Sequence, residues 1–361
     1  MENQVNLFLI STALQRINAN EAKAKFAISN QSAVLIVAAY SHNLVTIKKV
    51  IDYSQWKEVR YVNDDIDFIK NHEKNIKNRK YISAFIVVIS NLRKSLKIVS
   101  QYDRVEKLFV GNYANIDMLN LINHISYKSL ILLDDGIGTI EVNERRKKNI
   151  NYLKDFSGKL DMKAMVKKCL LGYRIYHPNN VCFFTIYDLK MRKGDTRVVN
   201  DFSETKKMIN RKGHLNAVYF VGGPYSELHP ILFTESNYFK YLIEIKTYFK
   251  DMDFIYIPHK AESSEKINKI KNYLNITVQP IDLPVELSLI GLPRFPLRLS
   301  GFVSSALVNC KLIFEKELTI VSIKINKRKI VNTDAWEDIN KVYSYYATIA
   351  DDNFRIVELC D

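Results

Sequence analysis

The sequence predicts an α/β protein that contains two parallel sheets covered by helices. Short apolar runs rich in β-branched residues alternate with longer, lysine-rich stretches of helical spacing, which is the pattern of parallel strands and their crossover helices. This pattern stops in a polar stretch over residues 190–201 and then begins again. Single hydrophobic cores usually stop growing near about 250 to 300 residues. A chain of 361 residues is therefore expected to hold two units.

The first unit is predicted to cover residues 1–200 in a Rossmann-like arrangement. Two stretches, residues 44–53 and 91–101, carry apolar positions at helical spacing and are expected to be helices. Six apolar runs are expected to be strands, at residues 7–10, 33–37, 85–89, 108–110, 129–133 and 182–186.

The second unit is predicted to cover residues 201–361 with the same plan. Residues 318–325 alternate in hydropathy like an edge strand, and residues 333–350 are predicted to be a closing helix, a candidate to pack back on the first unit. Two Rossmann-like units that face each other across a cleft form the GT-B architecture, which is the predicted fold. The other expected elements are strands at residues 217–221, 254–257 and 276–278, and helices at residues 238–249, 265–274 and from Ser304 onward.

The charge of the chain favours an anionic partner. The net charge is +14, which suits nucleic acid, anionic lipid or a nucleotide-activated substrate. Residues 145–168 carry nine Lys or Arg against two acids, with apolar positions near helical spacing. This segment is predicted to be a basic amphipathic surface that contacts an anionic membrane, with a solvated helix face as the alternative. Nucleic acid is not expected, because no RNP, helix-turn-helix or zinc pattern is present.

The cysteines and the apolar runs indicate a cytoplasmic protein that is peripheral at the inner face of the membrane. Four widely spaced cysteines form no CxxC pair, which suits a reducing compartment. The first residues lack the charged and apolar regions of a signal peptide, and no run approaches the roughly 18 apolar residues of a spanning helix. The oligomeric state is left open, with a homodimer as one alternative.

Two adjacent carboxylates carry the clearest chemical signal in the chain. Asp134 and Asp135 follow a buried apolar run directly and precede Gly136 and Gly138. A strand in a parallel sheet delivers such groups to the edge where open α/β sheets bind ligands. Neighbouring carboxylates repel, which raises the pKa of one of them toward that of a general base. Asp134 is selected as the base because it follows the strand directly, and a solvated turn is the alternative interpretation.

In the second half, two loops after strands suit a phosphate group. Gly222, Gly223 and Pro224 follow the strand at 217–221, where glycines let backbone N–H groups approach an anion. His259 and Lys260 follow the strand at 254–257, and an imidazole beside a lysine can stabilise a leaving phosphate and protonate it. The alternative for the histidine is an ordinary surface position.

A pair of serines completes the candidate anion site. Ser304 and Ser305 open a predicted helix, where hydroxyls and unpaired backbone N–H groups occur together. The alternative is a plain serine N-cap.

In their order along the chain, these motifs resemble those of bacterial sialyltransferases of the lipooligosaccharide sialyltransferase and polysialyltransferase group. The motifs are LDDG, GGPY, IPH, PVE and FxSSAL, and LISTALQ at residues 9–15 and FVGNY at residues 109–113 fit the same pattern. The resemblance spans residues 5–315, and the order of the motifs carries its specificity. One departure is that the His-Pro pair of the family reads His259-Lys260 here.

The resemblance implies a metal-independent, inverting GT-B transferase that moves sialic acid from CMP-sialic acid to a glycan or glycolipid acceptor of lipooligosaccharide or capsule. No cofactor is expected. His259 is preferred over His177 and His229 because it lies between the glycine loop and the serine pair. The residues implied are Asp134 or Asp135 as the base, His259 at the donor phosphate, Ser304 and Ser305 as phosphate contacts, and Glu286 facing the CMP ribose or base.

Two alternative functions are left open. One is a GT-B transferase that uses another nonulosonic acid or a hexosyl nucleotide as its donor. Asp251 and Asp253 form a DxD that would suit a metal-dependent donor, but they precede a strand and are predicted to form a turn. The other alternative is a basic, non-enzymatic protein that binds nucleic acid or lipid.

Overall fold

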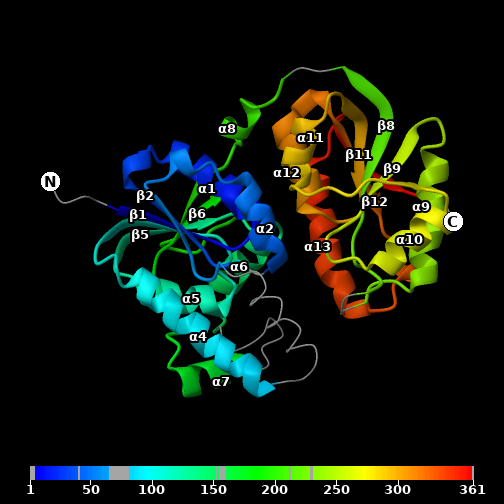
Figure 1. The fold of residues 1–361 in the computed structure, drawn as a ribbon. Helices are drawn as coiled ribbons and strands as arrows, with labels where there is room; N and C mark the ends of the chain where they lie inside the picture. The colour runs from blue at the N-terminus through cyan, green and yellow to red at the C-terminus, as the bar shows by residue number, and fades with distance from the viewer. Residues whose placement is uncertain are drawn as a thin grey trace. The chain divides into compact units, whose positions relative to one another are not determined.

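The computed structural model describes residues 5–39, 41–64, 81–151, 153, 160–210, 213–227 and 231–359. The chain divides into two compact units, Met1–Glu204 and Thr205–Asp361, each with one sheet (Figure 1). Every pairing between the described strands of both sheets is parallel. The predicted fold class, an α/β protein with two parallel Rossmann-like sheets, is confirmed.

The first unit has a seven-stranded sheet in the order β3-β2-β1-β4-β5-β6-β7. The strand order reverses between β1 and β4, and open α/β sheets bind ligands at such a switch point. The strands are β1 (Val5–Ile10), β2 (Ala33–Val37), β3 (Glu58–Tyr61), β4 (Val105–Val110), β5 (Tyr127–Leu133), β6 (Cys182–Thr185) and β7 (Thr196–Val199). The helices are α1 (Ala13–Lys25), α2 (Ser41–Val50), α4 (Tyr81–Val99), α5 (Ile116–Ile122), α6 (Gly138–Lys147), α7 (Met162–Leu171) and α8 (Ser203–Lys206).

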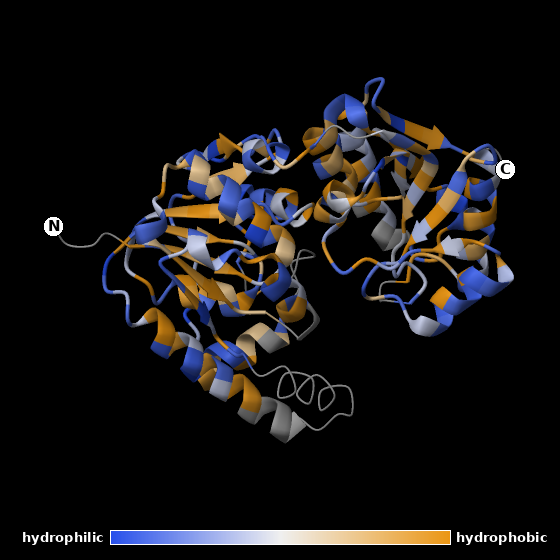
Figure 2. Ribbon diagram, turned by 45° about the horizontal axis from the view of Figure 1, so that its top comes forward, coloured by the Kyte–Doolittle hydropathy of each residue, from blue (hydrophilic) through white to orange (hydrophobic). Residues whose placement is uncertain are grey.

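The core of the first unit lies on both faces of its sheet. Side chains alternate between faces along a strand, so Leu7 and Leu9 of β1 join one cluster while Phe8 and Ile10 join the other. The first cluster includes side chains of α4 and α5, and the second includes side chains of α1 and α2. Figure 2 shows the hydrophobic colour concentrated on the strands. Burial on both faces explains why the central strands are continuous apolar runs.

The second unit has a six-stranded sheet in the order β10-β9-β8-β11-β12-β13, with the reversal between β8 and β11. Its strands are β8 (His214–Val221), β9 (Asp253–Ile257), β10 (Thr277–Val278), β11 (Phe295–Gly301), β12 (Thr319–Lys324) and β13 (Phe354–Glu358). Its helices are α9 (Glu235–Tyr248), α10 (Ser264–Tyr273), α11 (Val285–Gly291), α12 (Ser305–Phe314) and α13 (Thr333–Ile349).

The closing helix α13 packs on the sheet of its own unit. The hydroxyl of Tyr343 donates to the carbonyl of Ile323 at 2.9 Å and accepts from the N–H of Ile325 at 3.1 Å, so it secures the end of β12. The strand predicted at residues 318–325 is present as β12, but its predicted place at the edge is wrong, because β13 pairs with β12 on its outer side.

One predicted strand of the first unit is a helix. Residues 85–89 lie inside α4, which runs without a break from Tyr81 to Val99. A short apolar run does not by itself distinguish a buried strand from a buried helix. Here the run continues without a break into helical residues, of which Leu92 and Leu96, one helical turn apart, pack against the core.

The basic segment at residues 145–168, predicted to be an amphipathic surface at a membrane, does not form a single helix. It is divided between the end of α6 and the start of α7, and residues 152 and 154–159 lie outside the described residues. Arg145 and Arg146 are buried, and Lys167 forms an ion pair with Asp117 at 2.6 Å. Several of its charges are therefore internal contacts. In the part of the chain that the structure describes, no helix has the length and hydropathy to cross a membrane.

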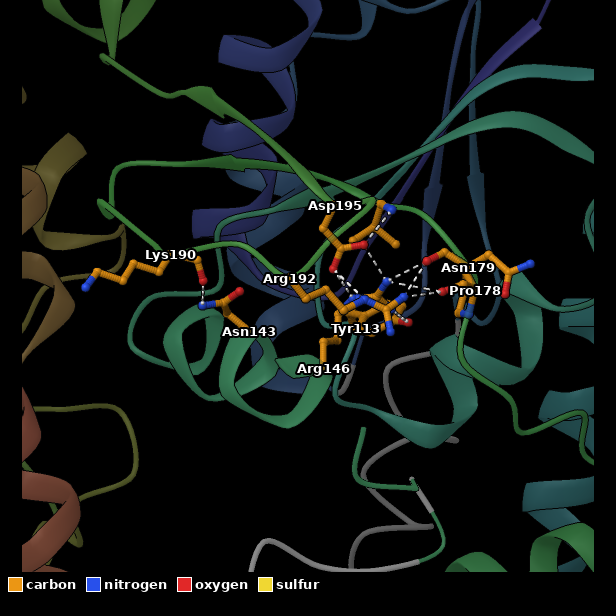
Figure 3. A network of polar contacts seen from close by, with 9 residues as sticks. Tyr113, Asn143, Arg146, Pro178, Asn179, Lys190, Arg192 and Asp195 are labelled. Carbon is orange, nitrogen blue, oxygen red and sulfur yellow. Dashed lines mark hydrogen bonds and ion pairs between the residues drawn. The ribbon is translucent and has the colours of Figure 1, made fainter. Parts of the chain in front are cut away.

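A buried arginine fixes the position of α6. Both side chains of the Arg146–Asp195 ion pair are fully buried, and the guanidinium donates to the two carboxylate oxygens at 2.8 Å each (Figure 3). Arg146 also donates to the hydroxyl of Tyr113 at 3.0 Å and to the carbonyl of Pro178 at 3.1 Å. Such bidentate contacts have fixed geometry. The pair thereby joins α6 to the loop after β4 and to the segment that leads into β7.

We expect Arg146→Met to lower the free energy of unfolding by about 3 to 5 kcal/mol, because it removes the bidentate partner of the buried Asp195 carboxylate and leaves it with single contacts from Arg192 and from the N–H of Val181. Lys147→Met is the matched control, since Lys147 lies next to Arg146 on α6 and pairs with Glu144 at the surface. Its expected cost is below about 1 kcal/mol. Urea unfolding of the two variants measures both values, and equal losses would contradict this role of Arg146.

Candidate functional site

In each unit, three loops that follow adjacent parallel strands collect at one edge of the sheet. In the first unit these loops follow β1, β4 and β5, which are neighbours in the sheet order. The loops after β4 and β5 carry Gly111 and the pair Asp134 and Asp135, and the loop after β1 leads into α1, whose third residue is Gln15. Strands that run in the same direction end at the same edge, so residues far apart in the sequence meet there.

Asp135 is the half-buried member of the carboxylate pair. It lines a cavity of about 20 Å³, the size of one water molecule, together with Gly111, Tyr113 and Thr139. Its Oδ1 accepts from Nε2 of Gln15 at 2.6 Å, and its N–H donates to the hydroxyl of Thr139 at 3.0 Å. Burial raises the pKa of the Asp135 carboxyl, and the hydrogen bond from Gln15 opposes that rise. A carboxylate at a pocket with a raised pKa is suited to accept a proton.

Gln15 is held in place from its other side. Its Oε1 accepts from the N–H of Ser11 at 2.7 Å and from the hydroxyl of Ser11 at 3.1 Å, so its amide hydrogens face Asp135. A Cβ atom at Gly111 would overlap the side chain of Gln15. The glycine at this position is therefore required for the contact between Gln15 and Asp135.

Asp134 is buried and its carboxylate is occupied by neighbouring groups. Its side chain accepts from the hydroxyl of Thr185 at 2.6 Å and from the N–H of Ile186 at 2.7 Å, while its carbonyl accepts from Asn18 at 2.9 Å. Only 3% of the residue is exposed, and burial raises the pKa of the carboxyl to about 7. Asp134 therefore joins the end of β5 to the end of β6 and to α1.

In the second unit the three loops follow β9, β8 and β11, which are also neighbours. The N–H of Gly222 donates to the carbonyl of Ile257 at 2.8 Å, which joins the glycine loop to the end of β9. The hydroxyl of Tyr225 donates to the carbonyl of Val303 at 2.9 Å, which joins the same loop to the residues before α12. The glycine, histidine and serine motifs are therefore brought together by direct contacts.

His259 lies exposed at the end of β9 beside Lys260, which is also exposed. Its backbone N–H donates to Oε2 of Glu262 at 2.7 Å, and its Nδ1 accepts from the N–H of Ala261 at 3.1 Å. A ring nitrogen that accepts a hydrogen bond carries no hydrogen, so the neutral imidazole carries its hydrogen on Nε2. The ring therefore presents a donor rather than an acceptor at Nε2.

The serine pair occupies the first positions of α12. The hydroxyl of Ser304 accepts from the N–H of Ala306 at 3.2 Å and so serves as the N-cap, which was the alternative interpretation. Tyr346 accepts from the N–H of Ser304 at 3.0 Å and donates to its carbonyl at 2.8 Å. Ser305 is the first residue of the helix. The pair is thus held by α13 at the edge of the sheet.

Glu286 is buried at the start of α11. It accepts from Nδ2 of Asn309 at 2.7 Å, and burial raises the pKa of its carboxyl. With 4% of the residue exposed, Glu286 joins α11 to α12 in this structure. Exposure of this carboxylate to a ligand would require these helices to separate.

The alternative metal motif and one of the two alternative histidines, His177, do not lie at these strand-end loops. Asp251 lies in the turn that leads into β9 and Asp253 is the first residue of that strand, at the opposite end from His259. His177 belongs to the first unit and contacts the carbonyl of Ile150 at 2.7 Å, and His229 lies outside the described residues. Among the described residues, no group of three His, Cys, Asp or Glu side chains is arranged to hold a metal ion.

Four residues that the sequence did not single out shape these edges. Gln15 and Thr185 contact the carboxylate pair, and Glu262 and Lys266 lie beneath the glycine and histidine loops. Gln15 lies within LISTALQ, whose place in the motif order was its only signal. The spacing of Glu262 and Lys266 allows a helical pair, but spacing does not reveal burial.

The raised pKa of Asp134 predicts that the stability of the first unit depends on pH. Because the folded pKa of about 7 lies above the ordinary value of 3.8, folding favours the protonated carboxyl. This stabilisation is complete below pH 3.8 and is lost as the pH rises through about 7. The urea midpoint of the wild type should fall over this range, and Asp134→Asn should reduce the fall.

Fluorescence of the buried Trp56, in a Trp336→Phe background, reports on the first unit for this measurement. Asp188→Asn is the control, since that carboxylate is 92% exposed in its pair with Arg197, and it should keep the wild-type dependence. An unchanged dependence in Asp134→Asn would contradict the assignment.

The comparisons with known proteins find structural similarity only. No family model and no curated protein matches the chain. Among solved structures, this chain is similar to a 2,6-sialyltransferase of a Photobacterium species of the Vibrionaceae in complex with CMP and lactose. The TM-score is 0.51, the sequence identity is 10%, and the match covers 99% of this chain and 78% of that chain.

Two further similar structures have lower scores. One is a UDP-glucosyltransferase from Polygonum tinctorium, with a TM-score of 0.45, 10% identity, and coverage of 94% of this chain and 89% of that chain. The other is a sialyltransferase from Photobacterium damsela, with a TM-score of 0.43, 10% identity, and coverage of 99% and 82%. The two parallel Rossmann-like sheets and the likeness to the 2,6-sialyltransferase identify the GT-B fold.

Proposed function

We propose that this chain is a glycosyltransferase that moves sialic acid from CMP-sialic acid to a hydroxyl of a lipooligosaccharide or capsule glycan. One observation carries the proposal. In a GT-B fold, a half-buried carboxylate, Asp135, lies at the ligand-binding edge of one sheet, and loops suited to a phosphate lie at the corresponding edge of the other. The similar 2,6-sialyltransferase, which is described with CMP and lactose, supports this choice of donor.

In this proposal Asp135 is the general base. An acceptor hydroxyl has a pKa far above 7 and needs a proton acceptor within hydrogen-bond reach as it attacks. Asp135 lines the pocket and has one oxygen oriented by Gln15, whereas both carboxylate oxygens of Asp134 are occupied within the protein. These contacts favour Asp135 over Asp134.

His259 then acts at the leaving group. The acceptor oxygen loses its proton to Asp135 and forms a bond with the anomeric carbon, the bond from that carbon to the phosphate oxygen breaks, and CMP leaves with the electron pair. A single displacement of this kind inverts the anomeric centre. For the departing phosphate, Nε2–H of His259 supplies a hydrogen-bond donor, Lys260 a positive charge and the N-terminal end of α12 the positive end of a helix dipole.

A panel of donors tests the proposal. The purified chain is incubated with lactose as the acceptor and with one donor at a time, and release of the nucleotide is followed. The donors are CMP-sialic acid, other CMP-nonulosonic acids, and UDP-, GDP- and ADP-activated sugars. Release of CMP from CMP-sialic acid, dependent on acceptor, is the expected result. Release from a hexosyl nucleotide alone would indicate a different donor, and release from none would favour a binding protein.

We expect Asp135→Asn to lower kcat by at least about 10²-fold while the KM for CMP-sialic acid stays near the wild-type value, because a base acts on the attack step. Asp134→Asn is the matched variant at the adjacent carboxyl. It keeps an acceptor for the N–H of Ile186 and should retain kcat within about tenfold. An inactive but folded Asp134→Asn beside an active Asp135→Asn would make Asp134 the base.

Activity is expected to persist after treatment with EDTA. CMP carries one phosphate, and the proposed charge balance comes from His259, Lys260 and backbone N–H groups. CMP release is measured before and after chelation, with added Mg²⁺ as the comparison. Loss of activity on chelation and its return with Mg²⁺ would contradict the metal-independent mechanism.

A further inference from the structure

The second unit contains a buried ion pair directly beneath its candidate phosphate loops. Nζ of Lys266 lies 2.7 Å from Oε1 of Glu262, and both side chains are fully buried. Nζ of Lys266 also lies 3.9 Å from the centre of the Tyr238 ring. A buried ion pair is often no more stable than the apolar residues that could replace it, so stability alone does not account for this one.

Each member of the pair reaches a different loop. Lys266 donates to the carbonyl of Gly223 at 2.9 Å, in the loop after β8. Glu262 accepts from the N–H of His259 at 2.7 Å, in the loop after β9, and from the hydroxyl of Tyr256 at 2.6 Å. A continuous series of hydrogen bonds therefore runs from the glycine loop through the ion pair to the backbone of His259.

The direction of these contacts suits an anion above the loops. Because Lys266 is fully buried, the carbonyl of Gly223 that it contacts points into the protein. The negative end of this carbonyl dipole is therefore turned away from the loop surface. At the loop surface it would repel a phosphate. A side chain at Gly222 would overlap Tyr256 and Glu262, so this loop lies directly against the buried cluster.

We propose that Glu262 and Lys266 are positioning residues that couple the glycine loop to the His259 loop and hold both in the geometry that binds the donor phosphate. This role rests on the proposed function, because it assigns the phosphate of a nucleotide sugar to these loops. The pair does not touch the phosphate. It acts through the carbonyl of Gly223 and the N–H of His259.

The test compares two lysines of the same helix in the full-length chain. Lys266→Met removes the buried contact. Lys269→Met is the matched control, because Lys269 forms the same i,i+4 pair with Glu265 at 2.9 Å, but at the surface. Hydrogen exchange followed by mass spectrometry reports on residues 222–227 and 258–262 as the two loops, and on α12 as the reference.

Lys266→Met is expected to raise exchange in both loops by at least about tenfold over the reference, while Lys269→Met leaves both within about twofold. A rise in one loop only, in neither loop, or equally in α12 would overturn the coupling. Glu262→Gln keeps the size of the side chain and removes its charge. Exchange in Glu262→Gln is measured in parallel. If Lys266→Met does not fold, a rise in both loops of Glu262→Gln supports the coupling, and a rise in one loop or in neither overturns it.

Kinetics separate this proposal from the proposed function. Lys266→Met should raise the KM for CMP-sialic acid at least about tenfold and leave the KM for lactose unchanged, because displaced phosphate contacts weaken donor binding. Equal changes in both KM values would overturn the positioning role. A wild-type chain that uses no donor contradicts the proposed function, whereas the exchange measurement, which needs no ligand, still decides whether the two loops are coupled.

Discussion

Parallel strand pairing is the constraint on which both units depend. A parallel strand must be followed by a return crossing, and the helices that make these crossings cover both faces of the sheet. The strands therefore become apolar, and polar chemistry is confined to the loops at their ends. The same topology brings Gln15, Gly111 and Asp135 together in one unit, and Gly222, His259 and Ser304 together in the other.

The buried charged side chains in these units form hydrogen bonds with the backbone of loops rather than with the sheets. Loop backbone beyond a strand end has no ladder partner, so its N–H and C=O groups need side-chain partners when they are buried. Asp134 accepts from Ile186, and Lys266 donates to Gly223, each just past the end of a strand. Arg146 donates to the carbonyl of Pro178, in the segment that leads into β6. A buried charge is costly unless all its contacts are made, which ties each loop to one conformation.

The sequence predicted the central strands well because they are buried on both faces. The strands that it missed, β3 (Glu58–Tyr61), β7 (Thr196–Val199) and β13 (Phe354–Glu358), lie at the edges of the sheets. Edge strands are partly exposed and mix charged with apolar residues, so no apolar run marks them. β11 (Phe295–Gly301) was missed although it is central, because Pro296 and Arg298 interrupt its apolar pattern.

The candidate site was predictable in its motifs but not in its division of roles. The motif around Asp134 and Asp135 indicates a carboxylate at a strand end. Which of the two is occupied within the protein depends on Thr185 and Ile186, which lie far away in the sequence. In the same way, the sequence indicates His259 but not the orientation of its ring, which depends on the turn to Ala261. Local sequence patterns identify the chemical groups of the site, and contacts between residues far apart in the sequence determine the role of each group.

The contact of Gln15 with Gly111 has a consequence for how this chain can vary. A side chain at position 111 cannot coexist with Gln15 in its present conformation, because the two would occupy the same space and the glutamine would have to turn away from Asp135. The two positions are therefore coupled, although position 15 lies in α1 and position 111 lies in the loop after β4. In related chains we expect them to covary: wherever position 111 is not glycine, position 15 should carry a shorter side chain, and Asp135 should have lost its amide donor.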